Sequence, residues 1–299
     1  MSQTRILVIR GGAIGDFILT LPALRLLRQQ APEAHLEVLG YPAIARLALE
    51  SGIVDRVRSI EYAALANFFN PGIELDKELS GYFADFELVV SYLYDPDGFF
   101  HGNLARAGVR TLIPCSHRID EEGAHAAAQL AQPLEQLALF LEDPAPALSF
   151  PRHLLERAAE FLGEALEPAP IAIHPGSGSP SKNWPLAHWL EIAQWLHQTR
   201  PGHPIVLLSG EADEEIIGPL LDFWSARSTP FRHLHGAELA LVGAVASRCA
   251  FFLGHDSGIS HLAAAAGAPC ILLFGPTAPG IWAPQNPAVR VIASESGGL

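Results

Sequence analysis

One lysine lies within a stretch of the chain that is rich in glycine and serine, HPGSGSPSKNWP, which runs from His174 to Pro185. The glycines of this stretch allow sharp bends, and its serine hydroxyls and backbone N–H groups can donate hydrogen bonds to an anion. Lysine is scarce, because of the 19 Lys and Arg residues in the chain only Lys77 and Lys182 are lysines. A helical pattern follows Pro185, and the positive end of its dipole would point at the stretch. These features predict a phosphate or diphosphate site at Lys182, although a solvated loop with one surface cation has the same composition.

A second turn, RGGAIGDF, places an aspartate among glycines. Gly11, Gly12 and Gly15 allow a tight turn and the close approach of a ligand. Asp16 lies in or next to the first turn of the following helical pattern, where a carboxylate can cap the helix or take part in catalysis. The turn is not the dinucleotide fingerprint G-x-G-x-x-G, because Arg10 occupies the first glycine position.

A third turn, GHDSGISHLAAAAG, gathers polar residues at the end of an apolar run. Asp256, Ser257 and Gly258 end a predicted strand, and His261 follows one helical turn later, so a polar cluster at the helix start is expected. The same residues also suit purely structural roles, with Ser257 as helix N-cap. A Ser-His-Asp triad is disfavoured, because the chain has no G-x-S-x-G elbow and a Ser and His four apart on one helix seldom meet.

We assign no metal site from the sequence. Asp95 and Asp97 have a D-x-D spacing, but the proline between them and the glycine after them favour a turn. Cys115, Cys249 and Cys270 are far apart and lack metal-ligand spacing, which indicates reduced, buried thiols.

The elements that must position these turns follow an alternating pattern. Strands are predicted at 5–10, 35–41, 54–62, 86–94 and 203–210, and a strand with its following turn at 170–176, 250–258 and 269–277. Helices are predicted at 17–32, 42–51, 156–166, 186–198, 238–249 and 259–267. Alternation of this kind predicts right-handed βαβ units and parallel sheets. The 299 residues are long for one core, and the proline-rich stretch 141–151 is a linker candidate, so we predict two α/β domains, 1–146 and 147–299.

Composition excludes several function classes. The formal net charge of −13 argues against broad nucleic-acid binding, which needs a basic surface. The apolar run at the N-terminus is too short for a secretory signal, and glycine or proline interrupts the longest apolar run, so no spanning helix is expected. We therefore expect a cytoplasmic protein.

Taken in this order and spacing, the three turns resemble the signatures of glycosyltransferase family 9, the ADP-heptose:lipopolysaccharide heptosyltransferases and their relatives. The resemblance covers RILVIRGGAIGDFILTLPALRLLRQQAPEAHLEVLGYP, HPGSGSPSKNWPLAHWLEIAQWL and FFLGHDSGISHLAAAAGAPCILLFGPTAP, and it extends over nearly the whole chain. It implies the GT-B architecture, in which two Rossmann-like parallel-sheet domains face each other across a cleft. The acceptor is then expected on residues 1–146 and the nucleotide sugar on residues 147–299.

The resemblance also implies a role for each turn. Asp16 matches the general base that takes the proton from the acceptor hydroxyl, and Lys182 matches the cation that stabilises the departing diphosphate. The implied donor- and nucleotide-binding residues are Ser177, Gly178, Ser179, Glu214, Asp256, Ser257, Gly258 and His261, and the acceptor-side loop holds Gly11, Gly12 and Gly15. Asp256 is expected to bind hydroxyls of the donor sugar. Glu214 is expected near the nucleoside.

The reaction implied by the resemblance is metal-independent, inverting glycosyl transfer without a cofactor, with ADP-heptose as co-substrate. The implied partners are this donor and a glycan or lipid-linked glycan acceptor of the lipopolysaccharide core, with no nucleic acid. Membrane contact would be at most peripheral, at the inner face of the cytoplasmic membrane. A closing segment is expected beyond the third motif, where this sequence stops at Leu299, and Arg106, Arg110 and Arg118 are too scattered to identify the acceptor.

Two alternatives remain open at this stage. One is a non-catalytic nucleotide-sugar-binding protein of the same fold, which the presence of Asp16, Lys182 and Asp256 disfavours. The other is an NAD-dependent oxidoreductase, which the interrupted glycine fingerprint disfavours. The position of Glu37 also argues against the oxidoreductase. A ribose-binding acid should lie at the end of its strand, whereas Glu37 lies before the end of the strand predicted at 35–41.

Overall fold

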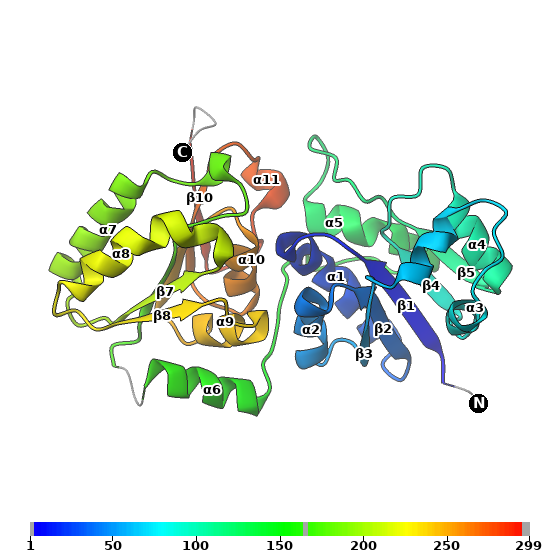
Figure 1. Ribbon diagram of the computed structural model, residues 1–299, viewed down its shortest axis with the longest axis horizontal. Helices are drawn as coiled ribbons and strands as arrows, with labels where there is room; N and C mark the ends of the chain where they lie inside the picture. The colour runs from blue at the N-terminus through cyan, green and yellow to red at the C-terminus, as the bar shows by residue number, and fades with distance from the viewer. Residues whose placement is uncertain (1–2, 164–166, 295–299) are drawn as a thin grey trace. The chain divides into compact units, whose positions relative to one another are not determined.

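The computed structural model describes residues 3–163 and 167–294, apart from the side chains of Ala212 and Glu214. The chain divides into two compact units, Met1–Pro144 and Ala145–Leu299. Each unit contains one parallel β-sheet with helices packed on its faces (Figure 1). The acceptor and donor roles assigned to the two domains stay predictions.

The first unit contains five parallel strands in the order β3-β2-β1-β4-β5. The strands are β1 (Arg5–Arg10), β2 (His35–Gly40), β3 (Arg56–Ser59), β4 (Leu88–Ser91) and β5 (Thr111–Pro114). The helices are α1 (Ile14–Gln30), α2 (Pro42–Glu50), α3 (Lys77–Ala84), α4 (Phe99–Ala107) and α5 (Ala126–Ala131), with 3₁₀ helices η1 (Ala63–Phe69) and η2 (Gln132–Leu137). Helices α1, α2 and α5 pack together, while α3, α4 and η1 enclose an aromatic core of Phe68, Phe83 and Phe100.

The second unit contains six parallel strands in the order β11-β10-β9-β6-β7-β8. The strands are β6 (Ile171–His174), β7 (Ile205–Ser209), β8 (Phe231–His235), β9 (Phe251–His255), β10 (Cys270–Phe274) and β11 (Val289–Ala293). The helices are α6 (Arg152–Leu162), α7 (Leu186–Thr199), α8 (Glu214–Ser225), α9 (Leu239–Ala246), α10 (Gly258–Ala265) and α11 (Pro279–Trp282), with 3₁₀ helices η3 (Pro180–Lys182) and η4 (Glu211–Asp213). Helices α7 and α8 cover a core that includes Trp189 and Trp224, and α9 packs between α6 and α10.

Both sheets have a point at which the chain changes its direction of travel across the sheet. In the first unit this point lies between β1 and β4, and in the second it lies between β6 and β9. The loops that leave two such neighbouring strands diverge to opposite faces, which opens a crevice at the carboxyl edge of the sheet. The turns singled out from the sequence follow β1, β6 and β9, so each lies at one of these two points.

Several predicted elements differ from the observed ones. Strands β3 and β4 are shorter than predicted, because only four residues of each pair with a neighbouring strand. Helix α1 begins at Ile14, so Gly15 and Asp16 lie in its first turn. Helix α6 ends at Leu162, because Gly163 adopts a left-handed φ of +87°. The last residues predicted for that helix, 164–166, lie outside the described residues.

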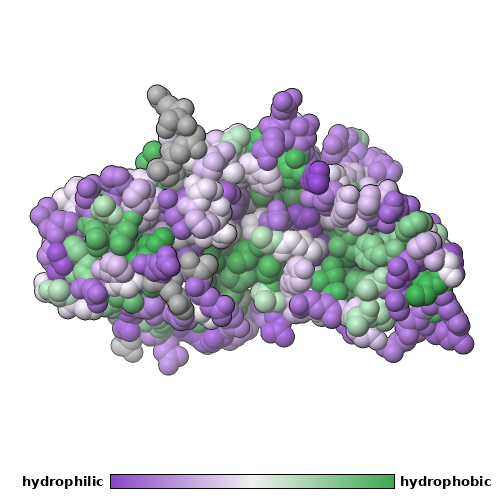
Figure 2. Space-filling view, turned by 45° about the horizontal axis from the view of Figure 1, so that its top comes forward, coloured by the Kyte–Doolittle hydropathy of each residue, from purple (hydrophilic) through white to green (hydrophobic). Residues whose placement is uncertain are grey.

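The molecular surface in Figure 2 is mixed in character, with hydrophilic residues interrupted by smaller apolar groups. Folded proteins ordinarily expose much apolar area of this scattered kind. Within the described ranges, no helix has both the length and the apolar character that crossing a membrane requires.

Candidate functional site

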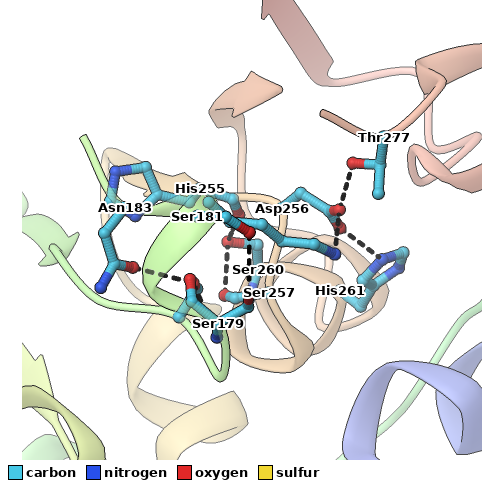
Figure 3. Close-up of polar contacts among 11 residues, drawn as sticks. Ser179, Ser181, Asn183, His255, Asp256, Ser257, Ser260, His261 and Thr277 are labelled. Carbon is cyan, nitrogen blue, oxygen red and sulfur yellow. Dashed lines mark hydrogen bonds and ion pairs between the residues drawn. The ribbon is translucent and has the colours of Figure 1, made fainter. Parts of the chain in front are cut away.

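Two loops of the second unit meet at the carboxyl ends of β6 and β9. Lys182 ends η3 in the loop after β6, and Asp256 is the first residue after β9. Lys182 Nζ donates a hydrogen bond to Asp256 Oδ2 over 2.6 Å. Thr277 Oγ1 donates to the same oxygen over 2.5 Å, and Figure 3 shows Thr277 and His261 on either side of Asp256. His261 Nε2, on α10, lies 3.8 Å from the other oxygen, Oδ1. Segments that are far apart in the sequence therefore converge on one carboxylate.

The Asp256 carboxylate is buried and charged. Its side chain is 7% exposed, whereas that of Lys182 is 28% exposed and reaches solvent. Burial raises the pKa of the Asp256 carboxyl, but the three neighbouring donor side chains outweigh burial and hold the pKa well below its usual range. Because Oδ2 accepts from two donors while Oδ1 has only the more distant His261, Oδ1 retains capacity for another hydrogen bond.

The loop after β6 is shaped by its own side chains. Ser177 is buried, and its Oγ lies 2.7 Å from the carbonyl oxygen of Ser179 and 2.8 Å from Asn183 Oδ1. The Oγ atoms of Ser179 and Ser181 lie 3.0 Å apart, nearer the surface. Gly178 is exposed, and a Cβ atom there would meet nothing within 4 Å. Ser177 thus fixes the loop, while the Ser179 and Ser181 hydroxyls are the donors nearer its outer side.

The turn after β9 is a helix cap. Ser257 is the N-cap residue of α10, and its Oγ accepts a hydrogen bond from Ser260 N over 3.3 Å. Ser260 Oγ in turn donates to the carbonyl oxygen of His255 over 2.5 Å. Gly258 is the first residue of the helix, and His261 lies in its first turn. The structural role considered for Ser257 from the sequence is therefore present, and its contact with a donor stays a prediction.

His255 ties the end of β9 to the start of α7. Its Nε2 accepts a hydrogen bond from Trp184 N over 2.8 Å, and its ring packs edge-on against Trp189 with centroids 5.2 Å apart. Burial lowers the pKa of His255 to about 4. The ring is therefore neutral at neutral pH, which leaves Nε2 free to act as this acceptor.

A buried pair, His174 and Asp213, lies beneath the loop and was not identified from the sequence. His174 Nε2 lies 3.2 Å from Asp213 Oδ2, which also accepts from Gly210 N over 2.7 Å. A Cβ atom on Gly176 would lie 1.6 Å from Asp213 Oδ1, so only glycine fits there. Asp213 therefore holds the loops after β6 and β7 together. In the sequence, the histidine of HPG at the end of a predicted strand could have indicated a buried polar contact. Its partner, Asp213, lies 39 residues away and could not be identified from the sequence.

In the first unit, Asp16 is both a helix cap and an accessible carboxylate. Its Oδ2 accepts a hydrogen bond from Ala13 N over 3.0 Å, and its side chain is 39% exposed. Gly12 has a φ of +106°, and a Cβ atom there would lie 3.0 Å from Asp16 Oδ2, so glycine permits the close approach. Gly11 directly precedes Gly12, and Gly15 lies within the first turn of α1.

Arg10 stands beneath Asp16 at the end of β1. It is only 6% exposed, and its Nη2 lies 3.2 Å from the carbonyl oxygen of Asp16 and 3.9 Å from Asp16 Oδ1. Burial lowers the pKa of the Arg10 guanidinium, and the Asp16 charge opposes this shift. The sequence marked Arg10 only as the residue that interrupts a glycine fingerprint, whereas the structure makes it a cationic support for Asp16.

The remaining predicted residues can also be placed. Glu214 is the first residue of α8, and its side chain lies outside the described part of the structure. Asp95 accepts hydrogen bonds from Phe100 N and His101 N and so holds the start of α4. The three cysteines are free and buried. Among the described residues, no group of His, Cys, Asp or Glu side chains is arranged to hold a metal ion.

The Glu37 carboxylate is buried and hydrogen-bonded in the interior of the first unit. It is the third residue of β2, its side chain is fully buried, and its Oε1 accepts a hydrogen bond from Tyr82 Oη over 2.8 Å. A ribose-binding acid must reach a ligand at the carboxyl edge of the sheet. The burial of Glu37 therefore removes the residue that an NAD-binding role would use.

Comparison with known sequences shows a family relationship. A model described as glycosyltransferase family 9 (heptosyltransferase) matches residues 107–298, well over half of the chain. Lipopolysaccharide heptosyltransferase 1 of Escherichia coli is 25% identical over 306 residues, 93% of this chain and 89% of that protein. Lipopolysaccharide heptosyltransferase 2 of Salmonella typhimurium is 30% identical over 125 residues, 41% of this chain and 35% of that protein. The match thus spans about a third of the latter relative's length.

Solved structures share the fold. A glycosyl transferase family 9 protein from Veillonella parvula superposes with a TM-score of 0.79 at 22% identity, covering 98% of this chain and 88% of that one. The Escherichia coli heptosyltransferase WaaC with ADP gives a TM-score of 0.70 at 20% identity, covering 99% of this chain and 95% of that one. These likenesses confirm the predicted α/β fold class of two parallel-sheet domains.

Proposed function

Since the chain belongs to glycosyltransferase family 9, we propose that it transfers heptose from ADP-heptose, with inversion, to a hydroxyl of a lipopolysaccharide-core or related glycan. Membership of this family confirms the relationship that the three motifs indicated. The donor, the catalytic residues and the acceptor are proposals that rest on the site described above.

The convergence of Lys182 and Thr277 on Asp256 carries this proposal. It places one partly exposed ammonium group at the carboxyl edge of the second sheet, beside the N-terminus of α10. Diphosphates bind where backbone N–H groups, a helix N-terminus and a cation meet. A donor diphosphate would share the Lys182 ammonium with Asp256. The same charge would then stabilise the negative charge that grows on the departing ADP.

Asp256 would bind the donor sugar. Its Oδ2 already accepts two hydrogen bonds, so the available acceptor is Oδ1, which lies 3.8 Å from His261 Nε2. A sugar hydroxyl that donates to Oδ1 would be fixed beside the diphosphate. Such a contact would orient the anomeric carbon without any metal ion.

Asp16 would act as the general base. Its Oδ2 caps α1 through Ala13 N, whereas Oδ1 faces Arg10 at 3.9 Å and the side chain is 39% exposed. The acceptor hydroxyl would donate its proton to the accessible carboxylate as its oxygen attacks the anomeric carbon. Arg10 Nη2, 3.2 Å from the carbonyl oxygen of Asp16, would help to hold the base in position.

The proposal of ADP-heptose rests on the family description and on the relative WaaC, which was solved with ADP. For a lipid-linked acceptor, the reaction would take place at the inner face of the cytoplasmic membrane, through peripheral contact.

The first experiment is calorimetric titration of the purified protein with ADP, UDP, GDP and NAD without added metal, followed by transfer assays with ADP-heptose. Selective ADP binding that weakens in Lys182→Ala, together with transfer to a deacylated core oligosaccharide, is the expected result. Preference for UDP or GDP would replace the donor, and selective NAD binding would overturn the proposal. ADP binding without any transfer would favour a non-catalytic nucleotide-sugar-binding protein.

A further inference from the structure

Two exposed tyrosines lie at the ends of adjacent strands in the first unit. Tyr41 follows β2 and Tyr62 follows β3, and they remain 41% and 42% exposed. The strand ends are joined by a hydrogen bond from Ile60 N to the carbonyl oxygen of Gly40, over 3.0 Å. The two aromatic side chains therefore stand on neighbouring segments at the carboxyl edge of the sheet.

Tyr41 and the segment that leads to Tyr62 border the glycine loop that precedes Asp16. A Cβ atom on Gly11 would lie 3.8 Å from Tyr41 Cε2 and 3.9 Å from Ile60 Cδ1. A Cβ atom on the next residue, Gly12, would lie 3.0 Å from Asp16 Oδ2. Tyr41 and Ile60 therefore lie next to Gly11, one residue before the glycine that lies against the candidate base.

Contacts that lead back into the core hold the Tyr62 ring. The Arg58 guanidinium carbon lies 5.6 Å from the centroid of the Tyr62 ring and 4.2 Å from that of Tyr82. Tyr82 Oη donates to the fully buried Glu37 over 2.8 Å. Tyr62 is therefore oriented before any ligand arrives, which lowers the entropy lost on binding.

Tyr41 is held through its backbone. It is the N-cap residue of α2, and its carbonyl oxygen accepts hydrogen bonds from Ile44 N over 3.0 Å and Ala45 N over 2.8 Å. Only two side-chain torsions remain free in a tyrosine, so an exposed ring on a fixed backbone offers a large contact area at low entropic cost.

We propose that Tyr41 and Tyr62 form an aromatic platform that binds one sugar ring of the acceptor glycan beside Asp16, an inference that rests on the proposed function. The face of an aromatic ring is electronegative, so it attracts the weakly positive C–H groups on one face of a pyranose. The sugar hydroxyls then stay at the rim, where they reach water, the tyrosine Oη atoms or the base. The Arg58 guanidinium already contacts the rings of Tyr62 and Tyr82. We therefore expect the acceptor to be recognised here by stacking of a sugar on the tyrosines, and not by binding of a phosphate to Arg58.

The test is a binding titration with a deacylated lipopolysaccharide inner-core oligosaccharide, followed by saturation-transfer NMR. Tyr41→Ala and Tyr62→Ala should each weaken oligosaccharide binding by about five- to tenfold, the loss expected for one aromatic stacking contact. Tyr62→Phe keeps the ring and should stay within about twofold of the wild type. Trp195→Ala is the matched control, because Trp195 is a 50% exposed aromatic residue on α7 of the second unit.

Calorimetric ADP binding in every variant separates this inference from the proposed function. Unchanged oligosaccharide binding in both alanine variants, or no oligosaccharide binding by a wild type that binds ADP, would overturn the platform and leave the donor site standing. Selective loss in the alanine variants of a wild type that binds none of ADP, UDP and GDP would support the platform and overturn the proposed transferase.

Discussion

Replacing Lys182 by alanine is the most direct perturbation of the proposed donor site. The ammonium lies 2.6 Å from Asp256 Oδ2 and is 28% exposed, so it is preorganised without being deeply buried. In Lys182→Ala the donor diphosphate would lose its charge-assisted contact. Asp256 would also keep its negative charge with no lysine to offset it, and would repel the incoming phosphates.

The magnitude follows from these two losses. A hydrogen bond to a charged group contributes about 1.5–3 kcal/mol, which corresponds to a roughly 10- to 150-fold change in Kd. Partial exposure lets solvent and salt screen the contact, so about 10- to 50-fold weaker ADP binding is expected at moderate ionic strength. Adding Asp256→Asn removes the unpaired charge, and the double variant should recover about fivefold of that loss.

The assay is calorimetric titration with ADP at fixed ionic strength for the wild type, both single variants and the double variant. Lys77→Ala is the matched control, because Lys77 is the chain's other lysine and begins α3 in the first unit. Equal ADP affinity in the wild type and Lys182→Ala would refute the phosphate role. A double variant weaker than Lys182→Ala would refute the repulsion argument.

Three further predictions concern the surrounding structure. Gly176→Ala should lower the free energy of unfolding by about 1–3 kcal/mol in urea titrations, because its Cβ would lie 1.6 Å from Asp213 Oδ1, whereas Gly178→Ala should stay within about 0.5 kcal/mol. Asp16→Asn keeps an oxygen that can cap Ala13 N, so thermal stability and ADP binding should be retained while sugar transfer is lost; normal transfer would exclude the general base. His255 has a folded pKa of about 4, below the unfolded value of about 6.5, so its contribution to stability is full above about pH 6.5 and is lost as the pH falls toward 4. His255→Asn should remove a slope of up to about 1.4 kcal/mol per pH unit in that window, and identical slopes would contradict the buried neutral ring.

Much of the fold was predictable because buried parallel strands are continuous apolar runs. RILVIR, IAIH and FFLGH stand out locally, and β1, β6 and β9 follow from them. Three other strands were missed for physical reasons. Strand β8 is FRHLH, in which three of the five residues are polar, β5 is only four residues long, and β11 is a largely exposed edge strand.

The site was predictable only in part, because its pairings depend on strand order. Lys182 and Asp256 were each marked by their local turns, but their ion pair joins residues 74 positions apart. They meet because β6 and β9 are neighbours in the sheet, a fact that no local pattern records. Thr277 and Asp213 were missed for the same reason, since each contributes through a partner on another strand end.

The structure also changes how capping and catalysis should be weighed against each other. From the sequence, Asp16 presents two competing interpretations, a helix cap or a base. In the structure one carboxylate oxygen caps Ala13 N while the other faces Arg10, and the side chain remains 39% exposed. The two oxygens of Asp256 also differ in their contacts. Oδ2 accepts hydrogen bonds from Lys182 and Thr277, whereas Oδ1 can still accept one from a ligand. Both oxygens of a carboxylate can accept hydrogen bonds, so a contact that fixes one oxygen also sets the direction in which the other can accept a hydrogen bond from a ligand. For each of these two carboxylates the structural contact would support the proposed chemical role, because a general base or a sugar-binding group must be held in place before the substrate arrives.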